Sequence, residues 1–384
     1  MKKLIIILIS CLYLSTNAQE TKTVEQLNGK TISINALKKR LAYLVDSAKI
    51  AGLQVAIINN NQTVWTGNFG YRNIEKQQPI ENNTVMYAAS LTKTLSAYLF
   101  LRLVDKGIFD LDVPLQHYLP KAIGQYPKWK DLGDDATAFN KITPRMLLSH
   151  SAGLPVLRGL YRGKVNLIAP PGEKFYYSNE GLNLLGFMIE EYTGKDLQQL
   201  AKEEVFGPLH MEHTAMVWDT AFENNYSIAY YKDGKVYGSE RRSESRAAGS
   251  MSTTAADYAK FISQLMLQKG LSHRLYAQML SAQIEVKSKR GFGPLKDSLT
   301  HDNDKIHLAW GLGTGLFQSN AGLGFFHTGH GEANQNYFVA FPAKGIAVVL
   351  LSNSENFESV SAQISKACIG DQYSPFSWLG HLDH

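Results

Sequence analysis

Ser90 and Lys93 have the side chains and the spacing that nucleophilic catalysis needs. The tetrad Ser90-Leu91-Thr92-Lys93 opens an apolar stretch that continues to Gly107. Residues three apart share one face of a helix, so this spacing brings the hydroxyl and the amine together. A base must take the serine proton before the oxygen attacks, and lysine can do so when burial makes its neutral form accessible. Taken alone, the pair is more typical of a helix N-cap serine followed by an exposed lysine.

Two further segments favour the catalytic interpretation. Tyr177-Ser178-Asn179 follows a turn at Pro170-Pro171-Gly172, and a helical pattern then runs to Gly194, so a loop presents a phenol and an amide. His327-Thr328-Gly329 lies in an expected strand, just before a predicted hairpin of residues 336–341 and 345–351. We expect Gly329 to let a substrate approach the strand edge closely.

These three segments, in this order, resemble a penicillin-binding-protein-like family of serine hydrolases. The family includes class C β-lactamases and low-molecular-mass D-alanyl-D-alanine carboxypeptidases, along with related esterases and D-aminopeptidases. The resemblance covers nearly the whole chain after the first 18 residues. Further segments similar to family landmarks are His150–Leu154, Gly186–Glu190, Gly249–Thr253 and Trp310–Gly313.

The resemblance implies that Ser90 attacks a carbonyl to form an acyl-enzyme, while Lys93 and Tyr177 share the role of base. The sequence leaves open which of these two takes the proton. Asn179 is expected to orient Lys93 and to hold a substrate amide. The backbone amides of Ser90 and His330 are the expected oxyanion hole.

The resemblance also implies substrate contacts from His327, Thr328, Gly329 and Asn353. Histidine at position 327 matches the form of this motif in DD-peptidases, whereas class C β-lactamases usually carry lysine there. A histidine would make the positive potential over the cleft depend on pH. Arginines that hold a substrate carboxylate in such enzymes commonly come from the strand or the C-terminal helix, yet no arginine follows Arg290. This favours an ester or amide substrate without a free carboxylate.

Peptidase, esterase and β-lactamase-like activities all remain open, and the substrate is expected to be a small molecule or a peptide. The alternative is a β-lactam or peptide receptor that is non-hydrolytic or acylates slowly. The presence of Ser90, Lys93, Tyr177 and Asn179 disfavours it, because a catalytically inactive site does not need groups that exchange a proton. Tyr71-Arg72-Asn73 repeats the Tyr-x-Asn pattern but falls in a predicted strand and is interpreted as structural. We expect no metal and no cofactor, because no His-x-His or His-Glu-x-x-His spacing occurs.

The first 18 residues read as a secretory signal, with Lys2 and Lys3 before an apolar run that is too short to span a bilayer. The chain is therefore expected to be periplasmic or secreted in a bacterium, or, alternatively, to be a lipoprotein anchored through Cys11. Cleavage after Ala18 would lower the formal net charge from +5 to +3. The remaining basic residues form only short runs, so no nucleic-acid partner is expected.

The expected fold is α/β (α+β) and β-lactamase/transpeptidase-like. Alternating patterns predict a hairpin of residues 53–59 and 63–71, and strands return from Leu308 onward, before a helix over 357–369. One antiparallel sheet built from both chain ends and flanked by helices is therefore expected. Residues 19–384 would form a single catalytic domain, with a sheet lobe of about 19–105 and 300–384 and an inserted helical lobe of about 106–299. Residues 292–304 are the predicted mobile flap.

Overall fold

A large antiparallel sheet assembled from both ends of the chain organises the molecule. The computed structural model describes residues 23–131, 136–161 and 163–381, so the predicted signal segment and Cys11 lie outside the described residues. In spatial order the sheet consists of β10 (Ile284–Glu285), β11 (Ala309–Trp310), β12 (Gly315–Ser319), β13 (Gly322–His330), β14 (Gln335–Phe341), β15 (Ile346–Ser352), β3 (Gly52–Asn59), β4 (Gln62–Asn73) and β5 (Gln78–Pro79). The predicted sheet from both chain ends is confirmed.

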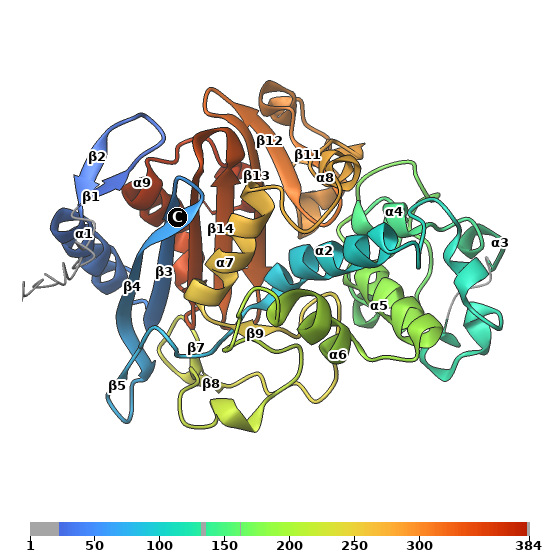
Figure 1. The fold of residues 1–384 in the computed structure, drawn as a ribbon, viewed down its shortest axis with the longest axis horizontal. Coiled ribbons are helices and arrows are strands. Elements are labelled where there is room, and N and C mark those ends of the chain that lie inside the picture. The colour runs from blue at the N-terminus through green and yellow to red at the C-terminus, as the bar shows by residue number, and fades with distance from the viewer. Residues whose placement is uncertain (1–22, 132–135, 162, 382–384) are drawn as a thin grey trace, which may run out of the picture.

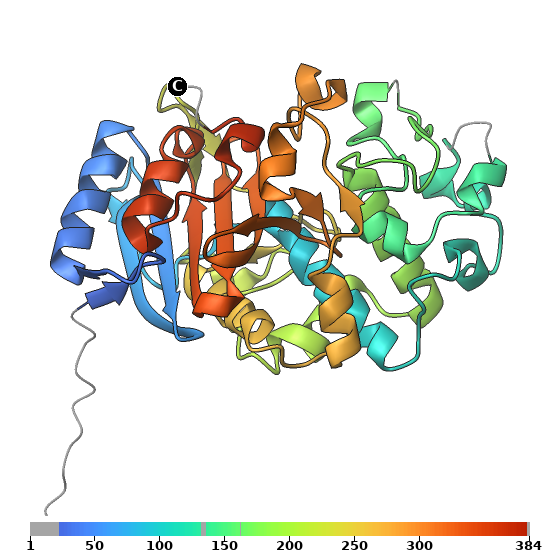
Figure 2. The ribbon, with the colours of Figure 1, turned by 90° about the horizontal axis from the view of Figure 1, so that it is seen from above.

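Helices cover both faces of this sheet. The described helices are α1 (Ile34–Ser47), α2 (Thr92–Asp105), α3 (Ala136–Phe139), α4 (Pro144–Leu148), α5 (Asn179–Thr193), α6 (Leu197–Ala201), α7 (Ala255–Met266), α8 (His273–Met279), α9 (Ser361–Ile369) and α10 (Phe376–Leu379). Figure 1 shows α7 lying across one face of the central strands, and Figure 2 shows α1 and α9 beside the sheet on the other side. Every described helix is too short or too polar to serve as a membrane span.

Alternation along β3 explains the two layers of core. Val55 and Ile57 pack into the hydrophobic cluster that includes α1 and α9, whereas Ala56 and Ile58 pack into the cluster that includes α2, α5 and α7. Successive side chains of a strand point to opposite faces, so a strand covered on both sides must be apolar throughout. All eight residues of β3 are buried.

Three short strand pairs complete the fold. They are β1 (Thr23–Glu25) with β2 (Thr31–Ser33), β6 (Met86–Tyr87) with β9 (Ser252–Thr253), and β7 (Ala229–Tyr230) with β8 (Val236–Gly238). The β6–β9 pair fixes the segment just before Ser90 to the segment just before α7. The nucleophile segment is therefore tied to the segment that leads into α7.

Two details differ from the sequence-based expectations. The sheet reaches further back in the chain than residue 300, because β10 adds an edge strand next to β11. The C-terminal helix α9 begins only at Ser361, because Phe357–Ser359 forms a 3₁₀ turn first. The predicted flap, residues 292–304, includes the 3₁₀ turn Pro294–Asp297 and the start of a second one, Asp302–Ile306. Its Leu299 forms a bridge with Ser288, which precedes the flap.

Candidate active site

Ser90 lies in a 3₁₀ turn, Ala89–Leu91, that leads directly into α2. Ala89 has a φ of +47°, a left-handed conformation that costs a residue with a Cβ atom roughly 1–2 kcal/mol. The turn is held by two buried hydroxyls: Thr92 Oγ1 donates to the Ala89 carbonyl at 2.6 Å, and Tyr258 donates to the Leu91 carbonyl at 2.9 Å. The strained residue next to Ser90 therefore persists because its surroundings hold it.

Lys93 is fully buried and its amine lies 2.9 Å from Ser90 Oγ. Its other hydrogen-bond partner is the carbonyl of Ala248, at 2.6 Å. No ion pair between Lys93 and a carboxylate occurs within the described residues, and burial holds the pKa of the Lys93 amine well below its ordinary value. The neutral amine is thus accessible, which a base for Ser90 requires.

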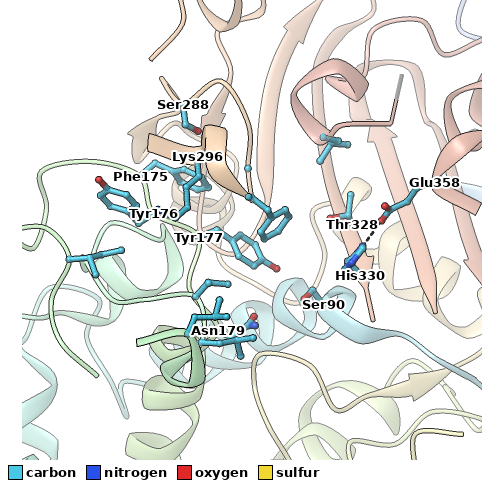
Figure 3. Close-up of a pocket in the computed structure, with 18 of the residues that line it drawn as sticks. Ser90, Phe175, Tyr176, Tyr177, Asn179, Ser288, Lys296, Thr328, His330 and Glu358 are labelled. Carbon is cyan, nitrogen blue, oxygen red and sulfur yellow. Dashed lines mark hydrogen bonds and ion pairs between the residues drawn. The ribbon is translucent and has the colours of Figure 1, made fainter. Parts of the chain in front are cut away.

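Tyr177 lies above the amine of Lys93, whose Nζ is 4.8 Å from the centre of the phenol ring. Its hydroxyl is buried, makes no hydrogen bond within the described part of the chain, and is directed toward Ser90 in Figure 3. Burial raises the pKa of the Tyr177 phenol, and the neighbouring Ser90 hydroxyl lowers it in part. The phenol is therefore neutral before a substrate binds.

His150 fixes the backbone of the Tyr177 loop. Its Nδ1 accepts a hydrogen bond from the Ser178 backbone N–H at 3.1 Å, and its ring centre lies 4.4 Å from that of Tyr177. Ser178 in turn caps α5, because its Oγ accepts from the Gly181 backbone N–H at 2.8 Å. These two hydrogen bonds hold the loop that carries the Tyr177 phenol and the Asn179 amide, as the sequence predicted.

Asn179, the first residue of α5, lines the cavity at Ser90, and its Oδ1 has no partner within the described residues. No hydrogen bond joins Asn179 to Lys93 among them. The backbone carbonyl of Ala248 holds the lysine instead, so the orienting role expected for Asn179 is not supported by this geometry. Its amide remains positioned to contact a substrate.

His327 is fully buried in β13 and close to the catalytic pair. Burial is the main cause that lowers the pKa of His327 to about 3. Its Nδ1 lies 2.6 Å from the Thr328 carbonyl, and its Nε2 has no partner within the described residues. The imidazole is therefore neutral over the ordinary pH range and does not supply the pH-dependent positive potential expected from the sequence.

Gly329 brings β13 against the nucleophile turn. A Cβ atom at this position would lie 2.5 Å from the Ala88 carbonyl oxygen, closer than any real contact of that kind. The close approach that requires glycine is therefore one of backbone to backbone, rather than of substrate to strand. It places Thr328 and His330 beside Ser90, where all three line one cavity.

His330 ends β13, and its side chain pairs with a carboxylate. Its Nδ1 lies 2.8 Å from Glu358 Oε1, and this contact raises the pKa of His330 above its ordinary value. Burial alone would raise the pKa of the Glu358 carboxyl. The contact with His330 acts in the opposite direction, and the pKa of Glu358 is lowered overall. The backbone amides of Ser90 and His330 lie in the two segments that meet here, as an oxyanion hole requires.

The cavity next to Ser90 has a volume of about 600 Å³ and mainly apolar walls. Figure 3 shows Ser90, Thr328 and His330 on one side and Phe175 and Tyr176 on the other, with Tyr177 between them. Phe292 of the predicted flap contacts the Tyr177 ring at 4.7 Å between ring centres, so this segment forms a wall of the cavity. The apolar part of the wall consists of Val156, Leu157, Leu160, Ile168, Phe175, Phe292 and Leu379.

Asn353 lies away from this cavity. Its Nδ2 donates to the carbonyls of Tyr71 and Ile228 at 3.1 and 2.6 Å, and the residue is fully buried. The substrate contact expected for Asn353 is therefore not supported, because its amide is hydrogen-bonded to two neighbouring segments.

Asn73, in the second Tyr-x-Asn triplet, caps a local turn by accepting from the Lys76 backbone N–H, which agrees with a structural role.

Residues that the sequence interpretation missed also border Ser90. Arg242 and Arg246 line a second, smaller cavity, which also includes Ser90, Asn179 and His330. In the sequence they form a short basic run without periodicity, and no local pattern indicates that this loop returns to the nucleophile.

Within the described residues, no group of three His, Cys, Asp or Glu side chains is arranged to hold a metal ion.

The chain is similar to known proteins over most of its length. The profile described as "Beta-lactamase" matches residues 37–366. Among curated proteins, a "Beta-lactamase" of Pseudomonas fluorescens is 25% identical over 346 residues, which cover 83% of this chain and 93% of that protein. A "Beta-lactamase" of Escherichia coli is 26% identical over 231 residues, or 57% of each chain. "Serine beta-lactamase-like protein LACTB, mitochondrial" of mouse is 28% identical over 141 residues, 37% of this chain.

The matched segment spans 24% of the mouse protein, so this chain covers less than two thirds of several curated relatives. Among solved structures, "D-alanine Carboxypeptidase AmpC" from Burkholderia cenocepacia is similar with a TM-score of 0.68 and 20% identity, over 87% of this chain and 97% of that chain. The "octameric penicillin-binding protein homologue" from Pyrococcus abyssi gives the same TM-score at 22% identity, over 85% and 74%. At this identity the structures support the fold.

Proposed function

The chain belongs to the β-lactamase family, and we propose that it is a serine hydrolase that works through an acyl-enzyme on an ester or amide bond. One observation carries the proposal. The amine of Lys93 is buried, has no carboxylate partner among the described residues, and lies 2.9 Å from Ser90 Oγ. This is the arrangement that turns a serine hydroxyl into a nucleophile at neutral pH.

In the proposed reaction Ser90 Oγ attacks the substrate carbonyl carbon and the neutral amine of Lys93 takes the hydroxyl proton. Burial favours the uncharged forms of both Lys93 and Tyr177, so the amine is the better first acceptor. The Tyr177 hydroxyl passes a proton to the leaving group as its bond to the carbonyl carbon breaks. The Lys93 ammonium returns its proton to the Tyr177 phenolate, which restores both groups. Water then attacks the carbonyl carbon of the Ser90 ester, and its proton passes through the same groups to the departing Ser90 Oγ. The carboxylic acid product is released and the free serine is restored.

The oxyanion of each tetrahedral intermediate would be held by the backbone N–H groups of Ser90 and His330. The mainly apolar cavity of about 600 Å³ favours a substrate with an apolar group on one side of the scissile bond. Esterase, D-amino-acid peptidase and β-lactamase-like activities all fit this chemistry. We also propose export to the periplasm or the medium, with lipid attachment at Cys11 as the alternative.

A substrate panel on the purified protein tests the proposal. It compares a 4-nitrophenyl ester of a medium-length fatty acid, a D-alanyl-D-alanine peptide and a cephalosporin, with Ser90→Ala as the matched control. Turnover of at least one compound that disappears in Ser90→Ala supports the proposal. A fluorescent penicillin that forms a lasting Ser90 adduct, without turnover of any compound, would favour the receptor function, and turnover that survives in Ser90→Ala would refute Ser90 as the nucleophile.

A further inference from the structure

A second, smaller cavity also borders Ser90. Its volume is about 150 Å³, and four residues belong to both this cavity and the larger one: Ser90, Leu157, Asn179 and His330. Its remaining lining includes Tyr87, Asn183, Arg242 and Arg246, so it is polar and cationic where the larger cavity is apolar. A substrate whose carbonyl carbon sits at Ser90 can extend into both.

Arg242 is held at this cavity with part of its donor capacity unused. Its guanidinium carbon lies 5.6 Å from the centre of the Tyr87 ring, and its Nη2 lies 2.8 Å from Glu240 Oε2. Its Nε is buried and has no hydrogen-bond partner within the described residues. Glu240 is itself shared, because its Oε1 accepts from the Tyr237 hydroxyl at 2.7 Å.

Arg246 has a weaker counter-ion still. Its closest carboxylate is Glu244, at 4.0 Å, and that side chain is 73% exposed. The guanidinium of Arg246 makes no hydrogen bond within the described part of the chain. A guanidinium presents paired donors that match a carboxylate, so an arginine without a close partner beside a cavity is suited to bind one.

The charges around the second cavity do not cancel. Glu240 is paired with Arg242, and Glu358 is paired with His330, which leaves Arg246 with only the distant, solvated Glu244. Asn183 adds a polar group, since its Oδ1 accepts from the Ala248 backbone N–H at 3.2 Å and its Nδ2 has no acceptor within the described residues. An anionic group would therefore gain a guanidinium and an amide without displacing a close ion pair.

We propose that Arg242 and Arg246 form a carboxylate-binding subsite, so that the substrate carries an apolar group on one side of the scissile carbonyl and an anionic group on the other. The proposal rests on the proposed function. It also revises the expectation of a substrate without a free carboxylate, which considered only arginines after residue 290. The loop before α7 supplies the guanidinium groups instead.

Three chromogenic esters test this subsite: 4-nitrophenyl butyrate, the 4-nitrophenyl monoester of glutarate, and 3-carboxy-4-nitrophenyl butyrate. The first is neutral, and the other two place a carboxylate on the acyl or on the leaving group. In Arg242→Gln and in Arg246→Gln, kcat/KM for one carboxylate ester relative to the neutral ester should fall about tenfold or more. The ester that responds identifies which side of the substrate enters the subsite.

Arg241→Gln is the matched control, because Arg241 is in the same loop but pairs with Glu223 and Tyr226 instead of lining the cavity. It should keep the ratio of the parent protein. The inference is overturned if both carboxylate esters keep that ratio in Arg242→Gln and Arg246→Gln. Binding of each ester to Ser90→Ala, by calorimetry, separates this outcome from a failure of the proposed function: the arginine replacements should weaken binding of the same carboxylate ester even where no ester is hydrolysed.

Discussion

Lys93 Nζ lies 2.9 Å from Ser90 Oγ, and its only other hydrogen-bond partner among the described residues is the Ala248 carbonyl at 2.6 Å. A buried cation normally requires a carboxylate, because desolvation of a charge is costly. The absence of one around the described part of this site indicates that the amine is kept in its neutral form for chemistry. Stability and activity should therefore respond in different ways when Lys93 is replaced.

Lys93→Met should lower kcat/KM by roughly a hundredfold to ten-thousandfold, because a positioned base is lost. The melting temperature should change much less than the activity, since an apolar chain of similar length replaces a buried amine while the Ala248 carbonyl loses its donor. Ester hydrolysis and calorimetric melting on the same preparation measure both effects. Lys106→Met is the control: Lys106 follows the other end of α2 and pairs with Glu204 at the surface, so it should keep full activity. Near-parent activity in Lys93→Met would contradict the assigned base.

Tyr177→Phe should abolish most turnover while leaving the fold intact. The Tyr177 hydroxyl has no hydrogen-bond partner within the described residues. Its removal therefore breaks no hydrogen bond there and leaves no buried polar group without its partner. The loss in kcat should be roughly a hundredfold or more, because proton transfer to the leaving group fails.

The Tyr337 hydroxyl is the matched comparison, because it is also buried but donates to Ser374 Oγ at 2.7 Å. Tyr337→Phe should reduce the free energy of unfolding by about 1 kcal/mol and retain activity. Urea unfolding and steady-state kinetics on both variants give the two readouts. An active Tyr177→Phe protein would remove Tyr177 from the mechanism.

The sheet and the positions of the three motifs could be predicted from the sequence because they depend on local patterns. Alternation in residues 53–59 and 63–71 gives β3 and β4, and the helical pattern ending at Gly194 gives α5. Convergence of the Ser90, Tyr177 and His327 segments came from the family resemblance. No local pattern brings together residues that are 87 positions apart, as Ser90 and Tyr177 are, or 150 positions apart, as Tyr177 and His327 are.

The environment of each side chain could not be predicted, because it depends on tertiary packing. Nothing near Ala89 in the sequence indicates a φ of +47°, and the Asn353 amide is held by carbonyls of Tyr71 and Ile228, which come from distant segments. Arg242 lines a cavity together with Ser90 for the same reason, because an irregular loop brings it there. Burial of His327, which decides its charge, likewise depends on elements that pack over β13 from elsewhere in the chain.

Gly329→Ala should damage the oxyanion site without touching a catalytic side chain. The added methyl group would lie 2.5 Å from the Ala88 carbonyl oxygen, so β13 must move away from the nucleophile turn. Displacement of the His330 amide should lower kcat by roughly a hundredfold to a thousandfold. Gly124→Ala is the control, since a Cβ there meets no atom within 4 Å. Equal kinetics for the two variants would show that this close approach does not position the oxyanion hole.

His327 and His150 should make the protein sensitive to acid well above the pH at which carboxylates titrate. Burial, the main cause, lowers the pKa of His327 to about 3 and holds the pKa of His150 well below its ordinary value. Both imidazoles are therefore neutral in the folded chain, whereas in the unfolded chain they take up protons below a pH of about 6.5. Because the unfolded state binds more protons, the free energy of unfolding falls as the pH falls from 6.5, toward about 3 for His327.

The expected slope is up to about 1.4 kcal/mol per pH unit for each histidine. Urea unfolding at pH 7.5 and at pH 5.0 measures it. His327→Gln removes one of the two groups, so its free energy of unfolding should change less between these pH values than that of the parent, whatever its stability at pH 7.5. If the variant and the parent lose the same free energy between pH 7.5 and 5.0, His327 is not held neutral by burial beside Lys93.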